Sequence, residues 1–459
     1  MIPDRFRFLV EETRDISDLF SKNGKTLFLV GGAVRDAILK PSFSKVKKDL
    51  DFTTDASPDE IETILRTVTK TIWTQGKRFG TIGCLYKGRN YEITTHRAEA
   101  YSYESRNPDV VFSQTIKSDL SRRDFTINAM ALKLPELELI DPFDGITDLS
   151  NKVLRTPLSA EESFSDDPLR MLRAARFIAA YDLEPTLEVV EAATKLARRM
   201  KIVSPERIRT ELDQLLVLDS PSKGLWFLVN TKVSDYFIPE LSALALQQDP
   251  IHKHKDVLAH SIAVVEKASP RRRLRLAALF HDIGKPKTRS IGPEGVSFHH
   301  HEVVGARMTK ERMKALSYSN EDIEIVSELV RMHLRFHTYQ MGWTDRAVRR
   351  YVRDAGDLLE DLNELTRCDS TTRNKTKAAA LARRMDELET RIAELEEKEE
   401  LNAIRPELNG SQIMEILNLS PGPDVGKALA FLLNLRLDEG ILGYEVVRQR
   451  LIDWWKLQR

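Results

Sequence analysis

The sequence has few cysteines, no long apolar run and no excess charge of either sign. Cys84 and Cys368 are the only cysteines among 459 residues, too few for a disulfide framework or a CxxC metal knuckle, which fits a reducing compartment. No stretch approaches 18 uncharged apolar residues, so no membrane span is predicted. The 70 Lys and Arg residues equal the 70 Asp and Glu residues. Any nucleic acid or membrane must therefore meet a local basic patch.

The N-terminal stretch MIPDRFRFLVEETRDISDLF carries acidic residues where a signal peptide needs an apolar core. Hydrophobic residues make up 41% and charged residues 31% of the chain, a composition typical of globular proteins. We therefore expect a cytoplasmic protein, long enough for about three domains.

The pattern of the sequence changes near residue 155. Before it, short β-type runs alternate with helical patterns such as 58–68, which indicates an α/β or α+β fold. These runs are TLFLV (26–30), LDFTT (50–54), TIGCLY (81–86), YEITTH (91–96) and ELELI (136–140). After it, helical periodicity dominates. We expect an α+β domain over 1–155 and all-α regions over 156–250, 251–400 and 401–459.

The first candidate site begins with LFLVGGAVRDAILK (27–40). An apolar strand runs into Gly31 and Gly32 and then into a helix, whose first backbone N–H groups can bind a phosphate where a side chain would block it. Arg35 lies one turn further on and can reach the same anion. The alternative for this stretch alone is a plain tight turn.

Two carboxylates follow in the strand-like stretch KKDLDFTTDA (47–56). Because side chains alternate along a strand, Asp49 and Asp51 project to one side, roughly 6 to 7 Å apart. Such a pair gains nothing unless a cation lies between the two groups, and Mg²⁺ prefers oxygen ligands. The alternative is a solvated strand face.

Three further segments are rich in Arg and Asp. SDLSRRDFTINAMAL (118–132) places basic, acidic and amide groups before an apolar run, and DPFDGITDL (141–149) is a turn rich in Asp. SDDPLRMLRAARF (165–177) spaces its polar residues by three, so that its arginines share one broad helical face, which alone is more typical of solvated surface. These segments offer donors and acceptors for a triphosphate, a ribose and a base edge, from Arg122, Arg123, Asp124, Asn128, Asp167, Arg170, Arg173 and Arg176.

In this order, LVGGAVRD, DLDF, RRDFTINAMA, DPFDGITDL and DDPLRMLRAARF resemble the motifs of the class II CCA-adding tRNA nucleotidyltransferases and bacterial poly(A) polymerases. The resemblance extends to SPERIRTEL (204–212). It implies a mixed-sheet nucleotidyltransferase head, a helical neck and body that select the base and hold RNA, and a helical tail. The family usually has Glu-Asp where this chain has Asp166-Asp167.

The resemblance also implies residue roles. Asp49 and Asp51 would bind two Mg²⁺ ions, and Glu92, on the strand YEITTH, is our candidate for a third carboxylate. Triphosphate contacts would come from the glycine turn, Arg35 and Arg123, and Asp124 would sense the ribose 2′-hydroxyl. Asp167 and Arg170 would pair with cytosine or adenine, supported by Arg173 and Arg176.

The implied reaction is template-independent addition of CCA to tRNA from CTP and ATP. Poly(A) synthesis or partial CC- or A-addition stay open as alternatives. DPFDGITDL favours full CCA addition, because the resemblance implies that it is the flexible loop that partial CC-adding relatives are expected to lack.

A second candidate site lies in the helical region after residue 250. His281-Asp282, at the end of an apolar helix, forms the core of an HD motif, with His260 and Asp369 as further metal ligands. The region resembles the HD domain attached to many bacterial CCA-adding enzymes, which implies either a metal-dependent phosphohydrolase or a structural remnant. An HD-type phosphohydrolase whose head only binds nucleotide is a third function class. Additional ligands or RNA contacts are His299, His300, His301 and His333.

Three other segments have simpler patterns. KLARRMK (195–201) and RRRLR (271–275) are the densest basic stretches and are candidates for contact with the tRNA backbone, or are solvated helix faces. MDELETRIAELEEKEE (385–400) sets apolar residues at 3-4-3 spacing, which predicts a helix docked on its neighbour rather than a long coiled coil.

Overall fold

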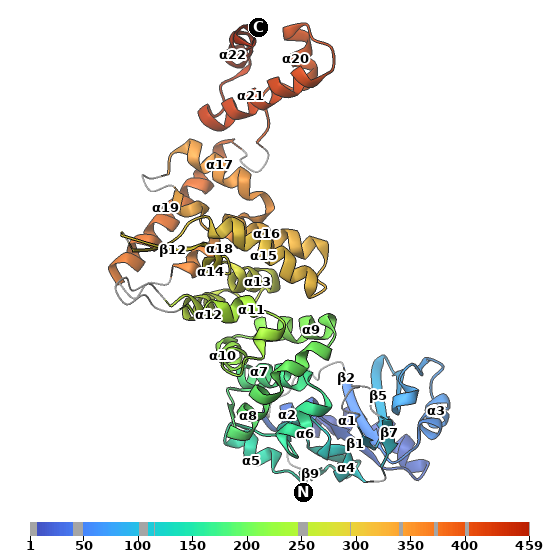
Figure 1. The fold of residues 1–459 in the computed structure, drawn as a ribbon. Helices are drawn as coiled ribbons and strands as arrows, with labels where there is room; N and C mark the ends of the chain where they lie inside the picture. The colour runs from blue at the N-terminus through green and yellow to red at the C-terminus, as the bar shows by residue number, and fades with distance from the viewer. Residues whose placement is uncertain are drawn as a thin grey trace. The chain divides into compact units, whose positions relative to one another are not determined.

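The computed structural model describes residues 7–39, 49–100, 109–113, 115–246, 256–293, 295–338, 343–370, 375–399 and 404–458 (Figure 1). These residues belong to two compact units, Met1–Ser242 and Ala243–Arg459. The boundary expected near residue 250 falls among residues outside the described ranges, and the finer division into four domains stays a prediction.

The first unit contains a mixed seven-stranded sheet in the order β3-β4-β5-β2-β1-β8-β9, in which β2 and β5 are parallel and the other neighbours antiparallel. Its strands are β1 (Leu27–Val30), β2 (Asp49–Thr54), β3 (Ile72–Trp73), β4 (Thr81–Tyr86), β5 (Arg89–Thr95), β8 (Ala131–Leu134) and β9 (Glu138–Ile140). Two smaller pairs are β6 (Arg97–Ala100) with β7 (Asp109–Phe112) and β10 (Val153–Leu154) with β11 (Glu184–Pro185).

Strand β1 is buried along its whole length because both faces of the sheet are covered. Leu27 and Leu29 enter one apolar cluster, whereas Phe28 and Val30 enter a second cluster on the opposite face. The strand therefore shows the two-residue alternation directly.

The helices of the first unit pack around this sheet and continue into an all-helical layer. They are α1 (Arg7–Lys22), α2 (Gly32–Leu39), α3 (Pro58–Arg66), α4 (Ile116–Ser121), α5 (Gly145–Ser150), α6 (Ala160–Asp166), α7 (Leu169–Tyr181), α8 (Leu187–Leu196), α9 (Pro205–Leu216), α10 (Ser222–Asn230) and α11 (Pro239–Ala243). Local sequence sets their ends. For example, Ser57 and Glu60 form a capping box at the start of α3, with Pro58 in the first turn.

The described residues of the second unit are helical or irregular apart from one hairpin, β12 (Arg289–Gly292) and β13 (Gly295–Phe298). Its helices are α12 (Val257–Lys267), α13 (Arg272–Phe280), α14 (Lys285–Thr288), α15 (His301–Ala315), α16 (Asn320–Met332), α17 (Asp345–Ala355), α18 (Leu359–Asp369), α19 (Lys375–Glu399), α20 (Gly410–Leu417), α21 (Pro423–Glu439) and α22 (Tyr444–Leu457). Met385, Leu388 and Leu395 on α19 are buried, so the predicted apolar seam is confirmed as packing surface.

The change from α+β to all-α is confirmed. The hairpin β12–β13 and the strands β6, β7 and β8 were not predicted, because short or continuously apolar runs lack a clear two-residue period. Among the described residues, no helix combines the length and apolar character that crossing a lipid bilayer requires.

Candidate active site and metal cluster

The glycine turn between β1 and α2 brings the backbone close to two predicted site residues. Gly31 has a φ of +71°, which only glycine adopts readily. A Cβ at this position would lie 3.4 Å from the Arg123 guanidinium and 3.9 Å from Asp51 Oδ2. The turn, one arginine and one carboxylate therefore meet at one place, although they come from three segments of the sequence.

Two acidic residues, Asp51 on β2 and Glu92 on β5, share one face of the sheet. Leu50 and Phe52 enter the core cluster on one side of the sheet, so Asp51 faces the other side. Asp49 lies two positions earlier on the same strand, where the structure describes only its backbone. Tyr91 and Ile93 enter the same cluster, and Glu92 is the direct register partner of Asp51. The pairing therefore places Glu92 beside Asp51, and carboxylates on one face suit a divalent cation.

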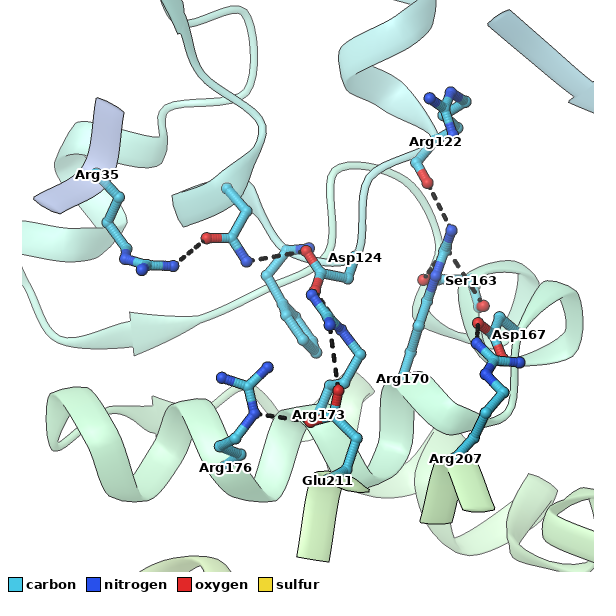
Figure 2. A network of polar contacts seen from close by, with 12 residues as sticks. Arg35, Arg122, Asp124, Ser163, Asp167, Arg170, Arg173, Arg176, Arg207 and Glu211 are labelled. Carbon is cyan, nitrogen blue, oxygen red and sulfur yellow. Dashed lines mark hydrogen bonds and ion pairs between the residues drawn. The ribbon is translucent and has the colours of Figure 1, made fainter. Parts of the chain in front are cut away.

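A continuous set of polar contacts links the head to the neck (Figure 2). Arg35 NH1 donates to Asn128 Oδ1 at 2.5 Å, and Asn128 Nδ2 donates to Asp124 Oδ1 at 2.9 Å. Asp124 Oδ2 accepts from Arg173 Nε and NH2 at 2.8 and 2.5 Å. Glu211 then accepts from Arg173 at 3.3 Å and from Arg176 at 2.7 Å.

Asp124 is the central acceptor of these contacts. Burial alone raises the pKa of this carboxyl, but the Arg173 guanidinium and the Asn128 amide outweigh burial and lower its pKa to about 2. Asp124 is therefore ionised at neutral pH. Its attraction in turn raises the pKa of Arg173.

Arg35 is buried, and three of its five N–H donors are used within the chain. Besides Asn128, it donates to Asp36 at 2.8 and 3.0 Å and lies 4.4 Å from the Tyr181 ring centre. These contacts make Arg35 a residue that positions Asn128. Its contact with a nucleotide phosphate stays a prediction.

A pocket of about 540 Å³ opens beside this network. Arg170 is buried, donating to Ser163 Oγ at 2.8 Å and to the Arg122 carbonyl at 2.6 Å, so the alternative of solvated surface is wrong for it. Asp167 accepts from the Leu169 backbone at 3.1 Å and from Arg207 at 2.8 Å. The pocket is lined by Arg122, Arg123, Asp124, Asp167, Leu169, Arg170, Arg173, Glu206, Arg207, Thr210 and Glu211.

Helix α9 supplies two polar residues that the sequence reasoning did not single out. Arg207 holds Asp167, and Glu211 holds both Arg173 and Arg176. The two residues are four apart and so lie on one face of the helix. This spacing within SPERIRTEL was the available signal, but their partners are about 40 residues away and the sequence does not reveal them.

The segment DPFDGITDL forms a turn that leads into helix α5, and its flexibility stays a prediction. Asp141 accepts from the backbone N–H groups of Gly145 and Ile146 at 2.7 and 2.9 Å, which fixes the start of α5. A Cβ at Gly145 would lie 2.3 Å from the Thr126 carbonyl. The segment is a packed turn and helix, and its bearing on full CCA addition stays a prediction.

The four residues predicted for the HD motif meet in the second unit. His260 Nε2 lies 2.8 Å from Asp369 Oδ1 and 3.3 Å from His281 Nε2. Asp282 Oδ2 lies 3.3 Å from His281 Nε2 and 3.7 Å from His260 Nε2. Residues from α12, the end of α13 and the end of α18 thus form one cluster, and all four side chains are largely buried.

Further histidines join this cluster, while others do not. His301 and His333 are buried beside Asp282, whereas His299 and His300 are exposed. Burial lowers the pKa of His333 to about 3 and also lowers the pKa of His260. Neutral imidazoles beside carboxylates are the donor set that a divalent transition metal prefers, so the residues fit a metal site.

The basic stretch 271–275 is not a free surface for RNA. Arg271 pairs with Glu360, Asp361 and Glu364, and Arg272 and Arg273 pair with Asp322. Arg275 is buried and donates to the Ala268 carbonyl at 2.8 Å. Most of the positive charge is paired within the unit, and a contact of this stretch with RNA stays a prediction.

The stretch 195–201 is only partly engaged within the chain. Lys195 pairs with Glu161 at 2.6 Å, and Arg199 donates to the Ser165 carbonyl at 2.8 Å. A contact of this stretch with RNA stays a prediction.

Three protein families match successive regions of the chain, from the head to the second unit. Residues 27–155 match the poly A polymerase head domain, residues 182–244 match a probable RNA and SrmB-binding site of polymerase A, and residues 257–391 match the HD domain. The first and third of these families imply divalent metal dependence, as the two clusters of ligand residues do.

Curated relatives carry two related names. An A-adding tRNA nucleotidyltransferase of Deinococcus radiodurans is 35% identical over 72% of this chain and 78% of its own length. A CCA-adding enzyme of Pediococcus pentosaceus is 37% identical over 49% of this chain and 55% of its own length. The region that matches this chain therefore covers just over half the length of that CCA-adding enzyme.

Solved structures of CCA-adding enzymes share the fold. The Bacillus stearothermophilus CCA-adding enzyme in complex with CTP aligns with a TM-score of 0.70 at 21% identity, over 100% of this chain and 99% of that chain. The Thermotoga maritima CCA-adding enzyme complexed with tRNA aligns with a TM-score of 0.62 at 19% identity, over 98% and 96% of the two chains.

Proposed function

Because this chain belongs to the family of CCA-adding and A-adding tRNA nucleotidyltransferases, we propose that it adds CCA to the 3′ end of tRNA, using CTP and ATP. The observation that carries the proposal is the pocket beside α7 and α9. There Arg123, Asp124, Asp167 and Arg170 line one space of about 540 Å³, large enough for a nucleotide. We place the reaction in the cytoplasm, where tRNA and nucleoside triphosphates meet.

The reaction is an in-line transfer of a nucleotidyl group. The 3′-hydroxyl oxygen of the RNA bonds to the α-phosphorus, its proton leaves, and the bond between the α-phosphorus and the pyrophosphate oxygen breaks. Asp49, Asp51 and Glu92 supply the oxygen ligands that Mg²⁺ prefers. When bound, Mg²⁺ would stabilise negative charge on the attacking and leaving oxygens.

The residues around the glycine turn orient the triphosphate. Because Gly31 and Gly32 carry no side chain, backbone N–H groups at the start of α2 can approach phosphate oxygens. Arg123, 3.4 Å from the position of a Cβ on Gly31, brings a guanidinium to the same place. Asp124 keeps Arg173 and Asn128 in position, and through Asn128 it fixes Arg35.

Base selection follows from the donors and acceptors of the pocket. Cytosine and adenine both present an amino donor beside a ring-nitrogen acceptor on the Watson–Crick edge, whereas guanine and uracil present a carbonyl acceptor beside an N–H donor. The Asp167 carboxylate accepts and the Arg170 guanidinium donates. The pair therefore complements cytosine and adenine and rejects the other two bases.

A-addition alone is the second candidate, because the relative matched over 72% of this chain bears that name. Two primers separate the candidates: tRNA that lacks all of CCA, and tRNA that ends in CC. We expect both primers to be completed when CTP and ATP are supplied together. Extension of the CC primer alone would show A-addition, and long tails from ATP alone would show poly(A) synthesis.

The buried His and Asp cluster favours a further activity, the metal-dependent hydrolysis of phosphate esters at RNA ends. His260, His281, Asp282 and Asp369 would hold the metal, which supplies Lewis-acid stabilisation of a phosphoryl group when bound. RNA ending in a 2′,3′-cyclic phosphate and RNA ending in a 3′-phosphate are the test substrates. Ring opening or phosphate release is expected from the purified protein. Failure on both substrates with Mn²⁺, Co²⁺ and Ni²⁺ would favour a structural remnant.

A further inference from the structure

One aromatic side chain lies on the face of the head sheet that carries the acidic residues. Trp73 belongs to the short edge strand β3 and is 39% exposed. The preceding residue, Ile72, packs against the core cluster. Because side chains alternate along a strand, Trp73 lies on the opposite face, which is the face of Asp51 and Glu92.

The strand register places Trp73 in one row with these two acidic residues. Trp73 on β3 is the register partner of Gly83 on β4. Gly83 is the partner of Glu92 on β5, and Glu92 is the partner of Asp51 on β2. Neighbouring strands lie about 4.8 Å apart, so the Trp73 backbone is roughly 10 Å from the Glu92 backbone.

The missing side chain at Gly83 lets the Trp73 ring lie across the sheet. A Cβ at Gly83 would lie 3.0 Å from Trp73 Cε3 and 3.7 Å from Trp73 Cβ. The indole therefore covers the Gly83 backbone, on the strand between Trp73 and Glu92. The cavity beside it has a volume of about 300 Å³ and is lined by Leu50, Trp73, Asn90, Tyr91 and Glu92. An aromatic ring and an acidic residue of the candidate metal site thus border one cavity.

The glycine turn and Trp73 lie on opposite sides of Asp51 in the sheet. Strand β1, which leads into Gly31, pairs with one edge of β2, whereas β5, β4 and β3 follow in order from its other edge. The glycine turn is the proposed site of the triphosphate. In an in-line transfer, the attacking and leaving oxygens lie on opposite sides of the α-phosphorus. We therefore expect the attacking 3′-hydroxyl on the side of Trp73.

On the basis of the proposed function, we propose that the Trp73 indole stacks on the terminal base of the RNA primer and so orients the attacking 3′-hydroxyl. Stacking suits this position because the terminal base changes during CCA addition, from the base before CCA to cytosine. Base–aromatic stacking accepts every base, whereas hydrogen bonds to a base edge do not. Trp73 is thus a primer-binding residue, distinct from Asp167 and Arg170, which select the incoming base.

A double-mutant cycle between protein and RNA tests the contact in the full chain. The parent and Trp73→Ala each receive tRNA lacking CCA, whose terminal nucleotide either carries its base or is abasic. Either change alone should lower kcat/KM for the primer about tenfold, and the combination should cause no further loss. The KM for CTP should stay unchanged. Additive losses, or a raised KM for CTP alone, would overturn the proposal.

Three variants control for changes in the sheet itself. Trp73→Phe keeps an aromatic ring and should retain most of the primer use. Gly83→Ala keeps Trp73 but displaces its ring, so it should weaken primer use as Trp73→Ala does. Leu85→Ala is the matched control, because Leu85 is also 39% exposed but does not line the cavity. An equal loss in Leu85→Ala would overturn the proposal, and circular dichroism confirms folding of each variant.

A binding measurement separates the stacking contact from the proposed function. 2-Aminopurine as the terminal base of the primer loses fluorescence when it stacks, and without CTP and ATP no catalysis is needed. We expect quenching by the parent and by Trp73→Phe, but not by Trp73→Ala. Such quenching without nucleotide incorporation would support stacking and refute the proposed function. Equal fluorescence with the parent and Trp73→Ala would refute stacking, whether or not nucleotides are incorporated.

Discussion

Replacing Asp124 with Asn tests whether one buried carboxylate holds the nucleotide pocket together. Its Oδ1 accepts from the Phe125 backbone N–H and from Asn128, both at 2.9 Å, and its Oδ2 accepts twice from Arg173. An Asn side chain keeps the shape, but one terminal atom becomes a donor. That donor must face the Arg173 guanidinium or the Phe125 and Asn128 donors, so at least one contact is lost.

The magnitude follows from the pKa of Asp124. Lowering it from the usual 3.8 to about 2 corresponds to roughly 2.5 kcal/mol of stability at neutral pH. An opposed pair of donors adds about 1 kcal/mol or more. We therefore expect Asp124→Asn to lower the unfolding free energy of the first unit by about 3 kcal/mol and to reduce nucleotide incorporation, because Arg173 and Asn128 lose their common partner.

The pH dependence has a definite sign. A carboxyl whose folded-state pKa is lowered contributes stability above its unfolded pKa and loses that contribution as pH falls through about 4 to 2. The part of the difference between the parent and Asp124→Asn that comes from the pKa shift, about 2.5 kcal/mol, should therefore shrink by about half near pH 3. Urea unfolding monitored by hydrogen exchange in residues 115–242 measures this difference for the first unit alone.

The control is Asp182→Asn. The pKa of Asp182 is also lowered to about 2, by hydrogen bonds from Lys152 and Lys223, but this carboxylate is exposed and its φ of 54° suits Asn. Exposed ion pairs contribute little, so we expect almost no change in stability. A loss in Asp124→Asn no larger than in Asp182→Asn, or a difference that stays constant down to pH 3, would refute the reasoning.

Three further predictions address the two sites. Asp49→Ala should abolish nucleotide incorporation and leave phosphate-ester hydrolysis intact, and His281→Ala should do the opposite; loss of both activities from either change would contradict two separate sites. Arg170→Ala and Arg207→Ala should each weaken the preference for CTP and ATP over GTP and UTP by about tenfold or more, as expected for one lost hydrogen bond to a charged group. Arg207→Lys should restore part of that preference. If single-nucleotide incorporation shows an unchanged preference, these residues take no part in base selection. Gly284→Ala should lower the Mn²⁺ occupancy of the second unit, because the added Cβ would meet the His301 carbonyl. Gly292→Ala is the control and should not lower the occupancy, because nothing lies within 4 Å of its added Cβ. Equal occupancy in both variants would contradict the close approach.

Local patterns were sufficient to predict the carboxylate face of the head. The alternation in DLDF and YEITTH assigns Leu50, Phe52, Tyr91 and Ile93 to the core, so the acidic residues between them face the other way. The parallel pairing of β2 with β5, which places Glu92 opposite Asp51, is a tertiary contact. The alternation of side chains along a strand predicts which face of the sheet a residue lies on, but it does not predict which strand pairs with that strand.

Charge density was a poor guide where partners are distant in sequence. Arg271 to Arg273 form a basic run, but Glu364 and Asp322, roughly 93 and 50 residues away, neutralise it. The run of three histidines was equally ambiguous. The tertiary structure separates them: His301, at the start of α15 and close to Gly284, is buried, while His299 and His300 are exposed.

The pocket geometry also bears on how one site treats two nucleotides. Under the proposed function, hydrogen bonding to Asp167 and Arg170 would reject guanine and uracil but would not order cytosine before adenine, because both bases present the same donor and acceptor. The remaining difference is size, since a purine needs more space than a pyrimidine. Arg207 is 41% exposed and holds Asp167 from α9, whereas Arg170 is only 9% exposed and fixed by Ser163 and Arg122. The side of the pocket able to adjust to the larger base is therefore the α9 side, and the contact between Arg207 and Asp167 connects that adjustment to the reading of the base.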